Sequence, residues 1–492
     1  MDLHRIAELL GVAQAYATTW AVFSFFATLL ISIIALGTIP GNRKPSTGVA
    51  WLLLVLLAPW FGLVAFWTFG NSRLGRVRAE RQNAAHGAIK RRFHEVDASN
   101  DLVDDPLMST ITRLAHDLGA MPIKSGNQVE LLPDYQATMD RMVAEIRGAQ
   151  SYVHAEFYIA ARDEMTQPFF DAMAEAAARG VDVYFLFDFL GSRRINGYKK
   201  MIAWLKQTDI HFAPMLPLSF RKRRFRRPDL RNHRKLLVVD GEAGFMGSMN
   251  LTEPGYNKPK NHKLGREWVE LMCRVTGPVV SALDAVFASD WYTETAVPLD
   301  VPPPKPTAGG VLAQLLPSGP GFVAENNLRV FASLIAAAET RLSITSPYFV
   351  PDESLLYTLT TAAMRGVDVE LFVSETSDQF VVGHAQASYY RSLLEAGVKI
   401  WMYPDPLILH SKHFTVDNKA AVIGSSNMDM RSFSLNYEIS LIMYGSDIVE
   451  DMRTIEDAYR AISRQLTLEE WESRSAGKKY LDNVFRLTSA LQ

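Results

Sequence analysis

The stretches HRKLLVVDGEAGFMGSMN, residues 233–250, and HSKHFTVDNKAAVIGSSN, residues 410–427, carry the same motif. Both read H-x-K-x4-D-x6-G-S-x-N with the same spacing. Six fixed residues, each at roughly one in twenty by average usage, match by chance on the order of once in 10^7 to 10^8 start positions. Two such stretches in one chain therefore indicate an internal duplication.

The duplication extends to the segments upstream of each motif. ARGVDV at residues 178–183 recurs as MRGVDV at residues 364–369, each after a helical pattern and before an apolar strand. A helix, a Gly turn and a strand are typical of an α/β unit with a mostly parallel sheet. We therefore expect an α/β fold of two tandem lobes, each a mixed, largely parallel sheet flanked by helices, which share one active site.

The residue types within the motif predict a pocket of hydrogen-bond donors. His and Lys, two apart on a strand, project from the same face, and the turn that follows lets the next strand bring Ser and Asn back toward the same place. Cationic and neutral donors with few competing acceptors suit an anionic tetrahedral group such as phosphate. The candidate catalytic residues are His233, Lys235, Ser248 and Asn250 in the first copy and His410, Lys412, Ser425 and Asn427 in the second.

The histidines are the reactive groups of this pocket. Near neutral pH an imidazole can act as a nucleophile or carry a proton. A metal site is the competing interpretation, but Lys is not a usual ligand, and the motif lacks the clusters of His and carboxylate that Zn²⁺ or Mg²⁺ prefer. We therefore expect no metal and no other cofactor.

Two kinds of acidic residue accompany the motif. Asp240 and Asp417 lie at the turn, out of phase with His and Lys, so we interpret them as turn residues and keep a catalytic role as the alternative. Glu438 and Glu270 each lie seven residues before a glycine that follows a strand, and this shared register selects Glu270 over Glu267. Such a carboxylate would orient an imidazole and stabilise its protonated form; the alternative is a solvated glutamate at a strand edge.

The composition excludes several classes of protein. Of the 492 residues, 48% are hydrophobic and 21% are charged, which is a globular composition without long-range disorder. A formal net charge of -2 gives no overall basic bias toward nucleic acid. The single cysteine, Cys273, excludes an intramolecular disulfide and a Cys-rich zinc site, and we expect it to be a small buried hydrophobe.

The N-terminal region contains two apolar stretches without a charged side chain. Residues 20–39 and 47–70 are each long enough to cross a hydrocarbon core of roughly 30 Å, which takes about 20 helical residues. We predict two transmembrane helices; a cleaved signal peptide for the first stretch, or buried core helices for both, are the alternatives.

The basic residues around these stretches predict the orientation in the membrane. By the positive-inside rule, everything after residue 72 faces the cytoplasm. The same residues would attract anionic lipid headgroups. Those after the second stretch are Arg73, Arg76, Arg78, Arg81, Lys90, Arg91 and Arg92, against only Arg43 and Lys44 between the two stretches.

These features divide the chain into five segments. The Pro-rich stretch of the chain, at residues 301–310, is typical of a linker between lobes. The segments are a two-span transmembrane anchor at residues 1–72, a basic linker and helical connector at 73–124, a first lobe at 125–300, the Pro-rich inter-lobe linker at 301–310, and a second lobe with a C-terminal helical tail at 311–492.

Over residues 125–447 the paired motifs resemble those of the phospholipase D superfamily, the HKD enzymes. Outside the motifs, the N-terminal spans and several segments look like bacterial cardiolipin synthase, and REWVELMCRVTGP at residues 266–278 resembles its long form with two membrane spans. The tail has Ala490 where the family commonly has Pro. The other similar segments are HAEFYI at 154–159, SPYFVPD at 346–352, YYRSLLEAGVKIWMY at 389–403, NMDMRSFSLNYE at 427–438 and the closing RLTSALQ.

The resemblance implies the transfer of a phosphatidyl group between two phosphatidylglycerol molecules, which yields cardiolipin and glycerol. One histidine would attack the phosphorus to form a phosphatidyl-histidine, the other would protonate the departing glycerol, and the roles would then reverse. By analogy with the superfamily we expect His233 as the nucleophile and His410 as the acid, whereas the two nearly symmetric motifs do not order them. The lysines and asparagines of both motifs would neutralise the non-bridging oxygens, with the serines in support.

The resemblance also implies a location. It predicts two phospholipase D-like lobes behind a multi-pass anchor in the bacterial cytoplasmic membrane, with the catalytic part facing the cytoplasm and anionic membrane lipids as partners. A homo-oligomer is compatible with this organisation.

A basic run, RKRRFRR at residues 221–227, precedes the first motif. Because membrane spans are present, we interpret it as a contact for anionic lipid, at roughly 1 kcal/mol per basic residue near the surface. The alternatives are a solvated loop and a nucleic-acid patch, and we expect no nucleic-acid partner.

The same pocket would also serve other reactions. A phospholipase D with water as acceptor and a transphosphatidylase with another phospholipid or alcohol differ from the first hypothesis only in the acceptor. A membrane-anchored nuclease fits less well, because the basic residues lack the interleaved aromatic residues of a strand-binding groove.

Overall fold

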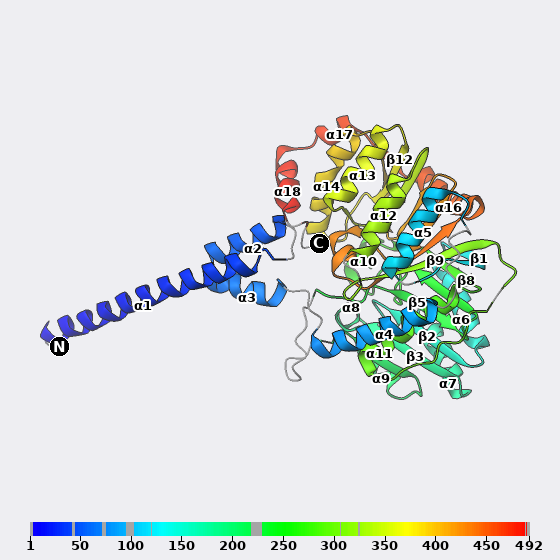
Figure 1. The fold of residues 1–492 in the computed structure, drawn as a ribbon, viewed down its shortest axis with the longest axis horizontal. Coiled ribbons are helices and arrows are strands. Elements are labelled where there is room, and N and C mark those ends of the chain that lie inside the picture. Colours follow the sequence, from blue (N-terminus) through cyan, green and yellow to red (C-terminus); the bar gives the residue numbers. More distant parts are fainter. Residues whose placement is uncertain are drawn as a thin grey trace. The chain divides into compact units, whose positions relative to one another are not determined.

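The computed structural model describes residues 3–41, 45–70, 75–94, 103–119, 121–217, 229–305, 307–322, 325–487 and 489. The chain forms two compact units, Met1–Arg73 and Leu74–Gln492. Figure 1 shows the fold with its helices and strands labelled. Three predicted features lie outside the described residues: the basic run at 221–227, the basic residues Arg43, Lys44 and Arg73, and Ala490.

The N-terminal unit consists of three helices, α1 (Leu3–Thr38), α2 (Pro45–Leu57) and α3 (Pro59–Phe69). Within α1, the 23 residues of Tyr16–Thr38 are long and apolar enough to cross a membrane, with a mean hydropathy of 2.2. Among the described residues this is the one helix that meets both conditions. The predicted anchor is therefore supported for its first span.

The second predicted span is divided into two helices. Pro59 has no backbone N–H and disfavours a helical conformation at the preceding Ala58, whose ψ is 73°. The two helices then pack together closely: a Cβ on Gly62 would lie 2.6 Å from the Cα of Val55, so this approach requires glycine. Helices of 13 and 11 residues therefore replace the continuous helix expected over residues 47–70.

The larger unit is built on one 15-stranded sheet with the strand order β19-β13-β12-β10-β15-β16-β18-β9-β1-β8-β6-β5-β2-β3-β4. The strands before the Pro-rich stretch are β1 (Lys124–Leu132), β2 (Tyr152–Phe157), β3 (Asp182–Asp188), β4 (His211–Met215), β5 (Lys235–Val239), β6 (Ala243–Gly247), β7 (Trp268–Val269) and β8 (Met272–Thr276). Those after it are β9 (Val311–Ser318), β10 (Arg341–Thr345), β11 (Phe349–Val350), β12 (Asp368–Ser374), β13 (Lys399–Tyr403), β14 (Ile408–Leu409), β15 (His413–Val416), β16 (Ala420–Gly424), β17 (Met428–Asp429), β18 (Glu438–Tyr444) and β19 (Arg464–Leu466).

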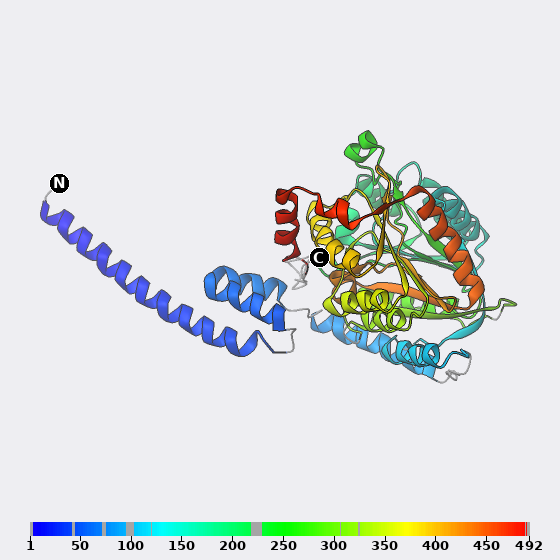
Figure 2. The same cartoon turned by 90° about the horizontal axis from the view of Figure 1, so that it is seen from above.

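Helices cover both faces of this sheet (Figure 2). The helices of the first half are α4 (Arg76–His94), α5 (Pro106–Gly119), α6 (Tyr135–Gly148), α7 (Gln167–Ala178), α8 (Phe189–Arg193), α9 (Tyr198–Leu205), α10 (Pro259–Leu264) and α11 (Val280–Thr295). The helices of the second half are α12 (Asn326–Ala336), α13 (Glu353–Met364), α14 (Phe380–Glu395), α15 (Met430–Ser434), α16 (Ser446–Ile462), α17 (Leu468–Glu472) and α18 (Ala476–Arg486). The predicted α/β class is thus confirmed.

The prediction of a largely parallel sheet is wrong. In the described part of the chain, the sheet is parallel only along β2-β3-β4 and along β10-β12-β13. Its other pairings are antiparallel, among them the hairpins β5-β6 and β15-β16 into which the two motifs fold, each joined by its Asp turn. The helix-turn-strand repeat on which the prediction relied describes only the outer part of each half.

The two halves join in the middle of the sheet rather than as separate sheets. Strand β9 pairs antiparallel with β1, in the register Lys124 to Ala313 and Asn127 to Val311. The Pro-rich stretch lies against this junction, and the Thr307 hydroxyl donates a hydrogen bond of 2.6 Å to the carbonyl of Gly126. The duplicated strands therefore form one continuous layer.

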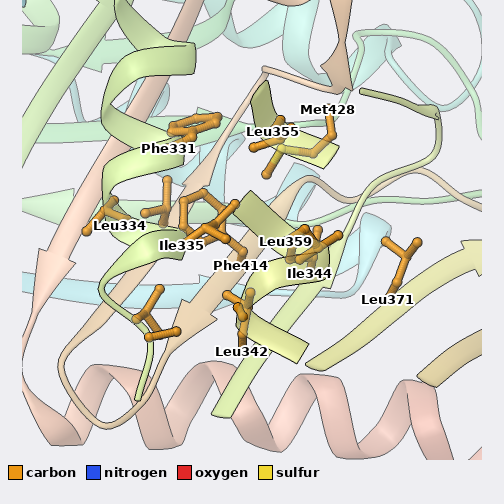
Figure 3. Packing of buried hydrophobic residues seen from close by; sticks show 14 of the residues in the cluster. Phe331, Leu334, Ile335, Leu342, Ile344, Leu355, Leu359, Leu371, Phe414 and Met428 are labelled. Carbon is orange, nitrogen blue, oxygen red and sulfur yellow. The ribbon is translucent and has the colours of Figure 1, made fainter. Parts of the chain in front are cut away.

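Alternating residues of the sheet build separate cores on its two faces. Leu236 and Val238 face a core under α11 and α16 that also contains Ile423 from the other half, so the two halves share it. The opposite face carries one core for each half. Figure 3 shows the core of the second half, in which Phe331 and Leu334 of α12 pack near Phe414 of β15.

Helix α4 is part of this unit rather than a free basic connector. Arg78 on this helix is 3% exposed, and its guanidinium pairs with Glu294 at the end of α11. The guanidinium also lies over the ring of Tyr437. Arg78 is therefore used within the fold, which corrects the expectation that it attracts lipid headgroups.

Candidate active site

Within each hairpin, the motif residues lie at the same end of its two strands. Each histidine directly precedes its hairpin, each lysine lies at or next to the start of the first strand, and Ser and Asn follow the second strand. His233 and His410 are 8% and 5% exposed, and Lys235 and Lys412 are buried. The predicted donor pocket thus collects ionisable groups inside the protein.

The carboxylate partner of each histidine comes from the other half of the chain. Nδ1 of His233 lies 2.9 Å from Oε2 of Glu438, and Nδ1 of His410 lies 2.8 Å from both oxygens of Glu270. The shared register predicts both glutamates but does not assign either one to a particular histidine. In the structure each histidine takes the glutamate of the other half, so that neither half holds a complete pair.

Backbone hydrogen bonds cause this exchange. The N–H of His233 donates to the carbonyl of Tyr437 at 2.9 Å, and the N–H of His410 donates to that of Val269 at 2.8 Å. Each histidine therefore lies beside the residue that precedes the glutamate of the other half. The parallel pairing of β14 with β7 extends one of these contacts.

The serines hold the glutamates. Ser248 donates a 2.5 Å hydrogen bond to Glu270, and Ser425 donates one of the same length to Glu438. Each hydroxyl in turn accepts from the backbone N–H that follows its glutamate. The serines therefore act on the carboxylates, where the sequence predicted support for the phosphate.

The histidines are neutral at pH 7 in this environment. Burial lowers the pKa of both His233 and His410 to about 4, although the glutamate beside each one opposes the shift. Burial alone would raise the pKa of Glu270 and Glu438, but the neighbouring histidine and lysine outweigh it and hold both below the ordinary value. A neutral imidazole that donates Nδ1–H to its carboxylate has an unprotonated Nε2, which is the nucleophilic form.

The lysines lie beside the histidine backbone. The ammonium groups of Lys235 and Lys412 donate to the carbonyls of His233 and His410, respectively. Burial lowers the pKa of Lys235 to about 7 and that of Lys412 to about 8. An anion that enters the pocket would raise these values, because it favours the charged form.

The asparagines differ between the two halves. Nδ2 of Asn250 donates to the hydroxyl of Tyr256 at 2.7 Å, and its Oδ1 accepts from the N–H of Ile159. Asn427 is 5% exposed, and its Oδ1 has no hydrogen-bond partner in the described part of the chain. The near symmetry of the motif residues does not extend to the groups around them.

The motif aspartates lie away from the histidines and act on the backbone. Asp240 accepts hydrogen bonds of 2.8 Å from three consecutive N–H groups, those of residues 150–152. Asp417 accepts from those of residues 339–341. Both have positive φ, 53° and 49°, which fits the turn interpretation.

Sequence reasoning missed three tyrosines. The ring of Tyr158 meets that of His233 edge-on at 4.9 Å, and Tyr348 does the same to His410 at 6.5 Å. These two tyrosines follow β2 and β10, the strands that match between the two copies. Their equivalent positions in the sequence could have identified them. Tyr256 had a different signal: 20 residues separate Asn250 from Glu270, whereas 11 separate the corresponding residues of the second copy.

In the parts of the chain that the structure describes, no group of three or more His, Cys, Asp or Glu side chains is arranged to hold a metal ion. Cys273 is buried, as expected. The groups that lie together inside the protein are two imidazoles, two ammonium groups and two carboxylates, since each lysine acts electrostatically on both histidines. Such a set is suited to proton transfer around an anion.

Comparisons with known proteins agree with this chemistry. The family described as "Cardiolipin synthase, PLD-like domain" matches residues 142–291 and 331–458, and "Phospholipase_D-nuclease N-terminal" matches residues 28–71. The chain is 32% identical to cardiolipin synthase A of Proteus mirabilis, over 96% of this chain and 98% of that protein. It is 33% identical to cardiolipin synthase A of Serratia proteamaculans, over 96% and 97%.

Among solved structures, the phosphatidylserine synthase of Haemophilus influenzae has a similar fold. Its TM-score is 0.58 at 14% sequence identity, and the match covers 77% of this chain and 99% of that one. At this identity the likeness concerns the fold alone.

A double-mutant cycle tests the exchanged pairs. We expect His233→Ala and Glu438→Gln to be coupled by about 1–3 kcal/mol in the free energy of unfolding, because the two groups are in contact in a buried site. The same-copy combination of His233→Ala with Glu270→Gln should show weaker coupling, because the hydrogen-bond partner of His233 is Glu438 and that of Glu270 is His410. Denaturant unfolding of the purified protein measures both. Stronger coupling in the same-copy combination would contradict the geometry.

Proposed function

This chain belongs to the cardiolipin synthase family of phospholipase D-like phosphatidyltransferases, and from this premise we propose that it joins two phosphatidylglycerol molecules into cardiolipin with release of glycerol. The observation that carries the proposal is the exchanged arrangement of His233 with Glu438 and His410 with Glu270 around one pocket. Two histidines, each oriented by a carboxylate, supply the nucleophile and the acid that a two-step transfer needs.

In the first step, we assign the attack on phosphorus to Nε2 of His233. A P–N bond forms, the bond from phosphorus to the glycerol oxygen breaks, and His410 gives its Nε2 proton to that oxygen. The imidazole of His233 is well prepared for this attack, because burial keeps it neutral and Glu438 accepts its Nδ1–H.

In the second step the histidines exchange roles. The neutral His410 removes a proton from the glycerol hydroxyl of the second lipid, which attacks the phosphorus, and the P–N bond breaks. His233 leaves as a neutral imidazole, and His410 is protonated again for the next cycle. Each proton taken from one lipid is thus returned to the glycerol of another.

The lysines stabilise the charge that develops on phosphorus. With a phosphodiester in the pocket, both ammonium groups would be protonated, because the anion raises their pKa from the values of about 7 and 8 in its absence. The same anion favours the protonated form of His410, which the first step requires. Asn250 and Asn427 add neutral donors to the non-bridging oxygens.

We also propose that the chain is a multi-pass protein of the bacterial cytoplasmic membrane with its catalytic unit in the cytoplasm. Helix α1 supplies one crossing. A second crossing requires α2 and α3 to open about Pro59 into one kinked span, which neighbouring groups in a bilayer tolerate. The excess of basic residues after this segment supports the cytoplasmic side. Anionic phospholipids are then both substrates and neighbours.

The reaction itself is tested in liposomes of phosphatidylglycerol alone, with excess chelator. We expect cardiolipin and free glycerol in equal amounts, because the pocket takes its charge from lysine and needs no second lipid. Chromatography of the lipids and an assay of released glycerol measure the two products together. Phosphatidic acid with glycerol would identify a hydrolase instead, and recovery of lost activity by a divalent cation would contradict the metal-free mechanism.

Histidine variants test the two-step mechanism. We expect His233→Ala and His410→Ala each to lower turnover by at least 10²-fold, because each removes a group that acts in both steps. With a phosphatidyl donor whose leaving group needs no acid, such as a p-nitrophenyl ester, His410→Ala should accumulate a phosphoramidate on His233. Mass spectrometry detects this adduct. His116→Ala, on helix α5 outside the site, is the matched control and should retain full activity.

An N-terminal tag tests the membrane topology. Two crossings place the N-terminus on the same side as the catalytic unit, because the chain returns to the side from which it started. Labelling with a membrane-impermeant reagent in sealed inner-membrane vesicles of both orientations measures the position of each end. A tag on the side opposite to the catalytic unit would show an odd number of crossings and contradict the proposal.

A further inference from the structure

Tyr256 breaks the two-fold symmetry of the active site. It lies in the segment from Asn250 to Glu270, which is nine residues longer than the corresponding segment from Asn427 to Glu438. Tyr256 is 7% exposed, and its ring packs against that of Trp268, with 4.5 Å between the ring centroids. The longer segment thus brings an aromatic side chain to one half of the site.

The hydroxyl of Tyr256 joins two groups of the site. It accepts a hydrogen bond from Nδ2 of Asn250 at 2.7 Å and donates one to Oε1 of Glu270 at 3.4 Å. A phenol has a single proton, and Asn250 already supplies a donor, so this proton is directed to the carboxylate. The same Oε1 lies 2.8 Å from Nδ1 of His410. A chain of contacts therefore runs from Asn250 to His410.

The second half has no equivalent chain in the described residues. Glu438, the partner of His233, accepts at Oε1 from the side-chain amide of Asn436 at 3.3 Å. That amide is not linked to Asn427, whose Oδ1 has no partner. A phenol is a stronger donor than an amide, because its proton is far more acidic, so the two carboxylates are in different environments.

The backbone around Tyr256 is strained and firmly held. Tyr256 and Asn257 have φ of 61° and 52°, a left-handed conformation that costs energy for residues other than glycine. The carboxylate of Glu253 accepts from the backbone N–H groups of Gly255 and Asn257. The carboxylate of Asp163 accepts from the backbone N–H of Glu253 and from the side-chain amide of Asn257, and so holds the same turn. Strain that the surroundings maintain in this way is typical of a functional position.

We propose that Tyr256 is a positioning residue that sets apart the roles of the two histidines: its hydrogen bond weakens Glu270 as a partner for an imidazolium, which makes protonated His410 the stronger acid toward the leaving glycerol. This inference rests on the proposed function. His233 keeps the more basic carboxylate, Glu438, and with it the greater nucleophilic strength. The order of the two histidines follows from the environment, although their motifs are the same.

The hydroxyl of Tyr256 changes the pKa of His410 through Glu270. A hydroxyl that stabilises the charge of Glu270 reduces the attraction of this carboxylate for a proton shared with His410. Burial raises the pKa of Tyr256 well above its ordinary value, so it remains a donor throughout the working range of pH. The titratable and charged groups that face His410 are Glu270, Lys412 on its own segment, Lys235 from the other half, and the tyrosines Tyr348 and Tyr256.

The test is the pH dependence of kcat in phosphatidylglycerol liposomes, which reports groups of the enzyme–substrate complex. Turnover falls at alkaline pH when His410 loses its proton. Tyr256→Phe should raise the pKa of His410 and move this alkaline limb upward by about half a pH unit. It should also lower kcat at neutral pH by up to about 3-fold, because His410 becomes a weaker acid by about half a pKa unit.

Tyr135→Phe is the matched control. The hydroxyl of Tyr135 donates to the carbonyl of Thr252 at 3.0 Å, so this variant also removes a tyrosine hydroxyl that anchors the segment, without touching Asn250 or Glu270. We expect its alkaline limb to coincide with that of the unmodified protein. An equal shift in both variants would reduce Tyr256 to a loop anchor and overturn the inference.

A second variant tests the same hydrogen bond without removing the hydroxyl, so that a folding defect does not complicate the result. Incorporation of 3-fluorotyrosine at position 256 retains the shape of the ring and makes the hydroxyl a stronger donor, so the alkaline limb should move downward. No shift, or a shift in the same direction as that of Tyr256→Phe, would overturn the inference. Failure of the proposed function is recognised separately, because the unmodified protein would then form phosphatidic acid, or no lipid product, in the phosphatidylglycerol liposomes, whatever the behaviour of Tyr256.

Discussion

The exchange of carboxylates between the halves of the chain is the constraint on which the rest of the structure depends. Glu438 contacts His233, and Glu270 contacts His410. Backbone hydrogen bonds between the two halves, from His233 to Tyr437 and from His410 to Val269, hold these pairs together. Neither half contains both members of a pair, so the site requires the continuous sheet that β1 and β9 close at its centre. The duplication is thus a condition for the chemistry, and the shared core under α11 and α16 keeps the halves in register.

Burial governs the electrostatics of this site. Without neighbours, two carboxylates and two lysines inside a protein would be strongly destabilising. Here Ser248 and Ser425 donate to the carboxylates, and the imidazoles remain neutral with pKa values of about 4. The pocket therefore holds nucleophilic imidazoles before the substrate arrives, and an entering phosphate anion draws protons onto the lysines and onto one histidine. Charge thus accumulates where the reaction needs it.

Symmetry in the motifs coexists with asymmetry around them. A two-step transfer needs one histidine as nucleophile and the other as acid, and two identical environments would not distinguish them. The additional segment between Asn250 and Glu270 introduces that difference through Tyr256, at the cost of a left-handed backbone held by Glu253. An insertion in one copy of a duplicated fold is a simple route from two equivalent half-sites to a directed reaction.

The sequence alone was sufficient for the α/β class, the duplication and the donor residues, because exact spacing and alternating apolar residues follow from local geometry. It also identified Glu270 and Glu438, since their distance from a glycine repeats in both copies. The partner of each glutamate, the antiparallel centre of the sheet and the role of Tyr256 depended on contacts between residues that are more than a hundred positions apart or in an unmatched insertion. The proline at position 59 indicated that the helix could break there. Whether the two parts would form one bent helix or pack against each other depended on the close contact of Gly62 with Val55, which the sequence does not show. Local patterns determine which side chains a strand presents, whereas the folded chain determines which of them meet, because a pairing between distant segments leaves no periodic trace in either one.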